Sequence, residues 1–194
     1  MWNERYAGNE FAYGTEPNSF LVQNASLLTS PVLSLAEGEG RNAVFLASLG
    51  LDVLGVDASD VGLAKAQQLA AAKGLSIRTE VADLASYEPP ENHYGSVISI
   101  SAHLPSTVRN RLYPQVERSL KSGGIILLEA YTKAQLSRNT GGPKDSDMLM
   151  DLKELTQQFP NCEPILAQET EREVIEGKFH TGLAWVVQFI ARKK

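Results

Sequence analysis

A glycine-rich turn between a strand-like and a helix-like segment is the first feature of the sequence that could do chemistry. Residues 36–42 are Ala-Glu-Gly-Glu-Gly-Arg-Asn. They follow an apolar run, residues 31–36, and precede a helical pattern that stops at Gly50. Glycines let a ligand approach the backbone, and a helix N-terminus presents unpaired N–H groups. Such a turn suits a carboxylate or a phosphate.

Asp57 is the acidic residue placed to work with this turn. It ends the next buried-type strand, residues 53–56, and lies 19 residues beyond Gly38. In an open α/β sheet this position brings the carboxylate into the crevice beside the turn, where it can accept hydrogen bonds from two ribose hydroxyls. Turn and carboxylate together indicate an adenosine-containing ligand. Residues 38–43 also match the dinucleotide pattern G-x-G-x-x-A, so the turn alone does not distinguish between cofactors.

The elements that must position these residues alternate between strands and helices. Helical patterns separate five strand-like segments, namely residues 31–36, 53–56, 77–82, 97–100 and 125–128. Most of these strands lack polar alternation, which indicates a parallel sheet covered on both faces. The sequence therefore predicts an α/β fold with a doubly wound, mostly parallel seven-stranded sheet of Rossmann-like type.

The C-terminal part follows a different pattern. After a helix near residues 151–159, two extended segments, residues 164–175 and 179–190, are joined through Glu176-Gly177-Lys178. So short a connection closes only an antiparallel pair, which predicts a C-terminal hairpin. The polar loop of residues 133–148 is longer than a simple connector and is a candidate lid.

Composition limits the classes of function. A net charge of −5 disfavours a nucleic-acid partner, because such proteins usually carry a basic surface. Cys162 is the single cysteine, which excludes an intrachain disulfide and favours a reducing compartment. No signal-peptide pattern and no apolar run of about 18 residues is present. We expect a cytoplasmic protein with no membrane partner, as a monomer or a homodimer.

The run VLSLAEGEGRNAVFLA, followed by LGVDAS, EVADL and LKSGGIILLEAY, resembles the class I methyltransferases that use S-adenosylmethionine. Within that class, G-x-G-R-N at residues 38–42 and the opening Trp2-x-x-Arg5-Tyr6 with YGTEP at residues 13–17 are similar to the small tellurite-resistance and thiol-methylating group. The resemblance covers nearly the whole chain. It implies one domain, residues 1–194, with a cofactor-covering arm and helix (1–30), a cofactor-binding core (31–132), a possible lid (133–148) and a C-terminal helix and hairpin (149–194).

The resemblance also implies roles for single residues. The backbone of Ala36, Gly38 and Gly40 would face the methionine part of S-adenosylmethionine, and Asp57 the ribose. The other implied cofactor contacts are Glu37 and Asn42 in the turn, Ala58 beside the adenine, Asp83 near its amino group, Leu84 beneath the ring, and Ser99, Ile100 and Ser101 near the sulfonium and the acceptor.

Two residues depart from the usual motif. Ser34 stands where the family has an acidic residue, so a charge that favours the cofactor's cationic amino group is missing, and Glu37 and Glu39 are the candidates to replace it. Ala36 stands where a glycine is usual, and its carbonyl remains available if its φ is negative.

In-line transfer from a sulfonium needs alignment more than a catalytic group. If the acceptor must lose a proton, His103 is the candidate base because it follows the fourth strand, although an exposed or helix-capping role is the more common one. Arg5 could reach the cofactor carboxylate from an N-terminal flap; an aromatic cluster that only anchors the arm is an equal alternative. The three histidines lack metal-ligand spacing, so we expect no metal.

The sequence thus predicts an S-adenosylmethionine-dependent methyltransferase that acts on a small molecule. The alternatives are an NAD(P)-dependent oxidoreductase and a non-catalytic S-adenosylmethionine-binding protein. Thiols, tellurium or selenium oxyanions, halides and other metabolites all remain open as acceptors.

Overall fold

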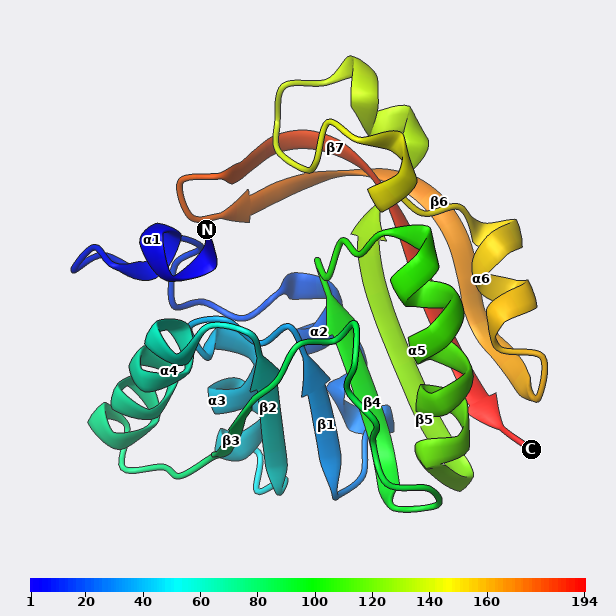
Figure 1. Ribbon diagram of the computed structural model, residues 1–194, viewed down its shortest axis with the longest axis horizontal. Helices are drawn as coiled ribbons and strands as arrows, with labels where there is room; N and C mark the ends of the chain where they lie inside the picture. Colours follow the sequence, from blue (N-terminus) through cyan, green and yellow to red (C-terminus); the bar gives the residue numbers. More distant parts are fainter.

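A seven-stranded sheet forms the centre of the computed structural model, which describes all residues from 1 to 194 (Figure 1). Its strands are β1 (Val32–Leu35), β2 (Val53–Asp57), β3 (Arg78–Val81), β4 (Tyr94–Ile100), β5 (Leu120–Tyr131), β6 (Cys162–Glu176) and β7 (His180–Lys193). Their order across the sheet is β3-β2-β1-β4-β5-β7-β6. The first five strands are parallel, whereas β7 runs antiparallel to β5 and to β6. The predicted fold class is confirmed.

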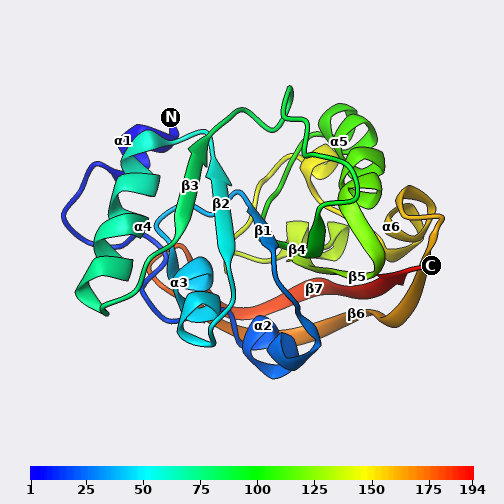
Figure 2. The same cartoon turned by 90° about the horizontal axis from the view of Figure 1, so that it is seen from below.

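Helices cover both faces of the sheet (Figure 2). They are α1 (Trp2–Tyr6), α2 (Ser19–Asn24), α3 (Arg41–Ser48), α4 (Asp60–Ala72), α5 (Ser106–Ser119) and α6 (Leu152–Gln158), with short 3-10 helices η1 (Ala25–Leu27), η2 (Lys133–Ser137) and η3 (Ser146–Met148). Residues of α2 and α3 share one buried cluster with the sheet, and residues of α5 and α6 share another on the opposite face. None of the helices combines the length and the apolar composition that crossing a bilayer requires.

The central strands β1 and β4 are mostly apolar because both of their faces are buried. Every residue of β1 and β4 is buried. In β1, Val32 belongs to the cluster under α2 and α3, whereas Leu33 and Leu35 belong to the cluster under α5 and α6. Successive side chains of a strand point to opposite faces, so a sheet between two helical layers needs apolar residues at every position.

Local signals set the starts of the two helices beside the glycine turn. The Oγ of Ser59 accepts a hydrogen bond from the backbone N–H of Gly62 at 3.0 Å, so Ser59 is the N-cap of α4. Gly40 precedes α3 with a φ of 93°. A Cβ at this position would lie 2.6 Å from Ala66 of α4, so the close approach of the turn to α4 requires glycine.

Strand β5 is longer than predicted, and the candidate lid contains short helices. Strand β5 begins at Leu120 and not at residue 125, because Leu120 already pairs with Tyr94, and a register shift that includes Gly123 with a φ of 80° separates this pair from the pairing of Ile125 with Ser96. The candidate lid, residues 133–148, contains η2 and η3. Glycines and polar residues signal a turn locally, but pairing with a neighbouring strand overrides that preference.

The hairpin of β6 and β7 extends past the parallel strands toward α1 (Figure 1). The backbone N–H of Lys178 in its turn donates to the carbonyl of Ala12 at 3.2 Å. Gly177 lies so close to Tyr13 that a Cβ would come within 2.5 Å of the Tyr13 backbone. The N-terminal arm and the hairpin turn therefore pack together at one end of the sheet.

Candidate cofactor and acceptor site

The strand order reverses between β1 and β4, which lie side by side although the chain makes β2 and β3 between them. A reversal of this kind opens a crevice at the carboxyl ends of the two strands, which is where ligands bind in such sheets. Ala36 follows β1 with a φ of 52°, and Ser101 follows β4 with a φ of 54°. Left-handed backbone at non-glycine residues costs about 1–3 kcal/mol and is concentrated at functional sites.

Ala36 does not meet the condition for its predicted carbonyl contact, because its φ is positive. It adopts left-handed backbone, which a glycine adopts without strain, and its contact with the cofactor stays a prediction. The turn is closely packed around it, with Glu37 N–H donating to the carbonyl of Val56 at 3.1 Å. The geometry of a glycine turn is therefore kept without the glycine.

The carboxylate of Asp57 lies against the turn, as the sequence predicts. Its Oδ2 accepts from the N–H of Gly38 and its Oδ1 from the N–H of Ser59, both at 2.8 Å. Burial raises the pKa of Asp57, and these backbone hydrogen bonds lower it. A carboxylate has about four lone-pair positions, so each oxygen keeps one for a further donor. That capacity suits the two hydroxyls of a ribose, and Ala58 lies exposed beside it.

Glu37 brings a carboxyl group to the position that Ser34 lacks. Its side chain is buried, with Oε2 bonded to the hydroxyl of Ser34 and Oε1 accepting from the N–H of Ala43 at 2.9 Å. Burial raises the pKa of Glu37 to about 7, although both hydrogen bonds lower it. Glu39 points elsewhere: it binds Lys65 at 2.9 Å and the N–H of Ala12 at 2.7 Å. Of the two candidates, Glu37 is therefore the one whose carboxyl lies beside Ser34, and its role as the replacement for the missing acid stays a prediction.

Other side chains of the motif hold the N-terminal segment. The Oδ1 of Asn42 accepts from the N–H of Asn18 at 2.9 Å, and Arg41 pairs with Glu176 at 2.8 Å. The side chain of Asn42 is thus engaged by the arm, and a cofactor contact through its backbone stays a prediction. In the G-R-N motif, Asn42 therefore fixes the arm to the turn, and Arg41 fixes the hairpin to it.

The arm covers the turn. In α1, the hydroxyl of Tyr6 lies 2.8 Å from where a Cβ of Gly38 would be, and its ring contacts the corresponding position of Gly62. Burial, followed by the charge of Asp57, raises the pKa of Tyr6, which keeps its proton. Arg5 donates to the hydroxyl of Tyr13 at 2.8 Å and stacks between the rings of Trp2 and Phe179. Its contact with the cofactor carboxylate stays a prediction.

The remaining predicted residues lie near the carboxyl ends of β3 and β4. Leu84 is buried in the cluster that also contains Leu35 and Val56. Asp83 is exposed, and its Oδ1 accepts from the N–H of Ala85 at 2.9 Å. Ser99 is buried in β4 beside Leu35 of β1. Their cofactor contacts stay predictions.

His103 does not have the geometry of a base. Its Nε2 accepts a hydrogen bond from the backbone N–H of Tyr131 at 3.0 Å, and its ring stacks on the Tyr131 ring with centroids 5.2 Å apart. Burial, with a further contribution from His180, lowers the pKa of His103 to about 3. Its lone pair is already used, so the structure favours a structural role for His103.

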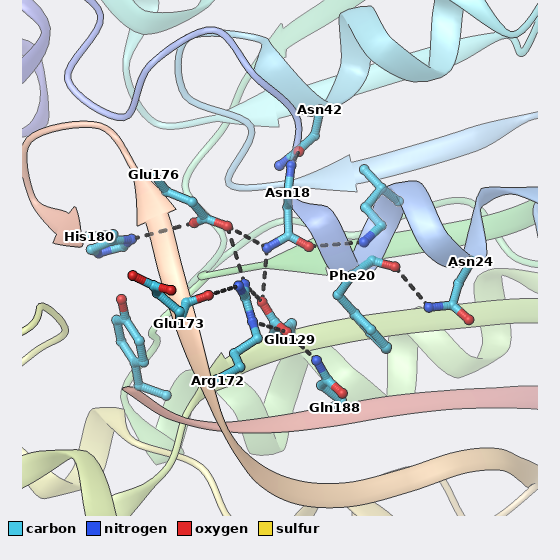
Figure 3. A network of polar contacts seen from close by, with 12 residues as sticks. Asn18, Phe20, Asn24, Asn42, Glu129, Arg172, Glu173, Glu176, His180 and Gln188 are labelled. Atoms are coloured by element: carbon cyan, nitrogen blue, oxygen red, sulfur yellow. Dashed lines mark hydrogen bonds and ion pairs between the residues drawn. The ribbon is translucent and has the colours of Figure 1, made fainter. Parts of the chain in front are cut away.

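A buried polar network beside this site has no local signal in the sequence (Figure 3). Asn18 donates to Glu129 at 2.9 Å and to Glu176 at 2.6 Å, and Arg172 pairs with both carboxylates. Gln188 also donates to Glu129, at 2.7 Å. The participants come from the arm, β5, β6 and β7. Charged residues in the alternating hairpin strands are the one hint that these side chains point inward.

Residues 32–124 match the model of the family described as "Methyltransferase domain". One relative, a 2-heptyl-1-hydroxyquinolin-4(1H)-one methyltransferase from Mycobacteroides abscessus, is 25% identical over 115 residues. The alignment covers 58% of this chain and 51% of the relative, so the chain spans about half the length of this curated protein.

Solved structures extend the similarity in fold to the whole chain. A protein from work on the conversion of a disulfide bond into a thioacetal group during echinomycin biosynthesis has a TM-score of 0.78 and 19% identity, covering 100% of this chain and 91% of that one. TehB from Haemophilus influenzae has a TM-score of 0.75 and 21% identity, covering 100% and 66%.

The chain has the fold of the class I S-adenosylmethionine-dependent methyltransferases. Residues 32–124 match a methyltransferase domain, and two further solved structures with this fold are named as S-adenosylmethionine-dependent methyltransferases, from Methanosarcina mazei and Mesorhizobium loti. The residues present fit S-adenosylmethionine. Asp57 has lone pairs left for the ribose, and Glu37 places an acid near the turn.

Proposed function

We propose that the protein is an enzyme that transfers the methyl group of S-adenosylmethionine to a small-molecule acceptor by direct in-line displacement. The observation that carries this proposal is the carboxylate of Asp57, fixed by two backbone N–H groups beside the turn where the strand order reverses. The antiparallel β7 between β5 and β6 adds support, because dinucleotide dehydrogenases generally continue parallel or add a substrate domain. The proposal includes the division into arm, core, lid and C-terminal segment.

The residues of this chain would act by binding and alignment. When bound, S-adenosylmethionine supplies an electrophilic methyl group on a sulfonium. Asp57 would hold the ribose, and Glu37 would provide negative charge for the amino group. The arm carrying Tyr6 would exclude water, and the strained Ser101 would border the acceptor. Holding two reacting atoms in line at about 3 Å accounts for much of the rate of such displacements.

A small acceptor is supported by the charge of the chain and by the enclosure of the site. The net charge of −5 disfavours a nucleic acid as the acceptor. The arm and the hairpin turn meet over the end of the sheet, with Lys178 bonded to Ala12. The curated relative is named for the methylation of a quinolone, which is a small molecule.

Calorimetric titration with S-adenosylmethionine, its demethylated product S-adenosylhomocysteine, and NAD tests the proposal. We expect micromolar binding of the first two and no binding of NAD. Binding of NAD alone would favour the oxidoreductase. Binding of S-adenosylmethionine without methyl transfer to any compound of a small-molecule acceptor screen would favour a non-catalytic binding protein.

A further inference from the structure

One buried histidine in the hairpin has a nitrogen without a hydrogen-bond partner. His180 is the first residue of β7, and only 8% of it is exposed. Its Nδ1 is enclosed and unpaired, 3.9 Å from Oε2 of Glu176 on the paired strand. That distance is too long for a hydrogen bond, yet no other acidic group pairs with the ring. The other ring nitrogen of His180, Nε2, is not among the buried atoms that lack a hydrogen-bond partner.

The carboxylate of Glu176 favours one tautomer of the neutral His180 ring. Burial raises the pKa of Glu176, but the contact with His180 and the charges of Arg41 and Arg172 outweigh it and hold the pKa well below its usual range. Glu176 is therefore ionised. An ionised carboxylate beside Nδ1 favours a proton on Nδ1, which leaves the lone pair of Nε2 free. Figure 3 shows Glu176 between His180 and the rest of the network.

The other elements around His180 present aromatic rings and one more unpaired polar atom. The hydroxyl of Tyr131 in β5 is buried and has no partner, and its ring lies 5.2 Å from that of His180. The ring of Tyr13 in the arm lies at 4.8 Å. In the loop of residues 133–148, a Cβ at Gly141 would lie 2.9 Å from Cδ2 of His180 and 3.0 Å from the Tyr131 hydroxyl. Two unpaired polar groups side by side in a native interior call for an explanation such as a ligand.

Tyr131 and Glu176 connect His180 to the end of β4. Ser101 at the end of β4 lines a narrow pocket together with Tyr131 and Glu176, and His180 contacts both of these residues. Tyr131 has His103 stacked on its ring as well as His180 at its edge, so two histidines flank one phenol. The lone pair of His103 is used by the backbone, whereas the Nε2 of His180 is not.

We propose that His180, positioned by Glu176, is the base that takes a proton from the methyl acceptor, and that the acceptor is a small molecule with an ionisable O–H, S–H or N–H group. This inference rests on the proposed function. The acceptor heteroatom forms a bond to the methyl carbon while the carbon–sulfur bond breaks, and the electron pair of that bond stays on sulfur as a neutral thioether. The acceptor proton moves to Nε2, and Glu176 balances the charge of the imidazolium.

The tautomer of His180 tests the positioning role without any acceptor. Nitrogen-15 NMR resolves the three histidines, which His93→Asn, His103→Asn and His180→Asn assign. We expect neutral His180 to carry its proton on Nδ1, and Glu176→Gln to raise the fraction of the tautomer with the proton on Nε2. A proton on Nε2 in the neutral ring of the wild type, or a tautomer ratio that Glu176→Gln leaves unchanged, would overturn the proposal.

The rate of S-adenosylhomocysteine formation tests the catalytic role, with two probes as acceptors. One is 2-heptyl-1-hydroxyquinolin-4(1H)-one, which must lose a proton, and the other is iodide, which has none. We expect His180→Asn to slow transfer to the first about 10²- to 10⁴-fold and to remove its acidic pH limb, with transfer to iodide and cofactor affinity unchanged. The exposed His93 is the control, and His93→Asn should change neither rate.

The outcomes separate the inference from the proposed function. Equal rates and pH profiles for wild type and His180→Asn, in a protein that transfers methyl groups, would refute the base and leave the methyltransferase standing. Absence of S-adenosylmethionine binding would refute the function itself. If neither probe is methylated, the NMR result still decides whether Glu176 holds His180 as proposed.

Discussion

The carboxylate of Asp57 accepts backbone hydrogen bonds through both oxygens, so its orientation is set before a ligand arrives. We expect Asp57→Ala to weaken S-adenosylmethionine binding tenfold or more, because a hydrogen bond to a charged group contributes about 1.5–3 kcal/mol. Calorimetry provides the measurement. Asp52 precedes the opposite end of β2 in an exposed ion pair, and Asp52→Ala should leave the affinity unchanged. Unchanged affinity in a folded Asp57→Ala protein would remove Asp57 from the site.

The left-handed backbone of Ala36 predicts an unusual response to glycine. The conformation costs an alanine about 1–2 kcal/mol, while glycine costs about 0.4–1 kcal/mol more unfolded-chain entropy. We expect Ala36→Gly to raise the free energy of unfolding by up to about 1 kcal/mol in a urea titration. Ala47→Gly, within α3, should lower it by roughly the same amount. Equal destabilisation by both substitutions would contradict strain at Ala36.

The buried carboxyl of Glu37 predicts a pH dependence of stability. Its pKa is about 7 in the folded protein, against an ordinary value of 4.5 for a glutamate in water, so the folded state binds more protons between these values. Stability from this group is therefore greatest below pH 4.5 and falls by about 3 kcal/mol as the pH rises to 7 and beyond. Glu37→Gln should flatten that part of the curve in urea unfolding across pH 4.5–8. A wild-type curve of the same shape as the variant's would contradict the assignment.

At the scale of elements, side chains of the glycine-turn segment hold the N-terminal arm. Glu39 holds the N–H of Ala12 and Asn42 holds the N–H of Asn18. Because the arm covers the turn, we expect bound S-adenosylhomocysteine to slow hydrogen exchange of the amides in residues 3–14. Amides of residues 88–93, at the amino end of β4, should exchange at the same rate with and without S-adenosylhomocysteine. Equal exchange in the arm with and without the ligand would exclude a covering role.

The elements that the sequence predicts well are those with local causes. Continuous apolar runs identify β1 and β4, and Ser59 caps α4 through a bond to Gly62, three residues away. The position of Asp57 follows from strand order alone. No local rule predicts hydrogen bonds between residues that are far apart in the chain. Asn18, for example, donates to Glu176, which lies 158 residues later in the sequence. The direction of Glu37 and the pairing of His180 could be known only after folding.

At the scale of the molecule, the buried network of Figure 3 joins parts of the chain that the sheet alone does not connect. Arg41 at the glycine turn forms an ion pair with Glu176 in the hairpin, and Asn18 in the arm donates a hydrogen bond to the same carboxylate. Glu129 and Arg172 extend the network into β5 and β6. The cofactor turn, the arm and the hairpin therefore share one set of charges, and a change in one of them affects the geometry of the others.

The charges of this network predict non-additive effects on stability. Arg172 lies between Glu129 and Glu176, so Arg172→Met leaves buried carboxylates without their partner and should lower the free energy of unfolding by about 3–5 kcal/mol. The exposed Arg78 is the matched control, and Arg78→Met should cost at most about 1 kcal/mol.

A double variant, Arg172→Met with Glu129→Gln, tests why Arg172→Met lowers the free energy of unfolding. Adding Glu129→Gln to Arg172→Met removes the stranded charge and keeps an acceptor for Asn18, so the pair should be more stable than Arg172→Met alone in urea unfolding. Simple addition of the two single losses would mean that Arg172 contributes packing alone. Recovery in the double variant would mean that its charge is what lets the arm, β5 and the hairpin meet at the site.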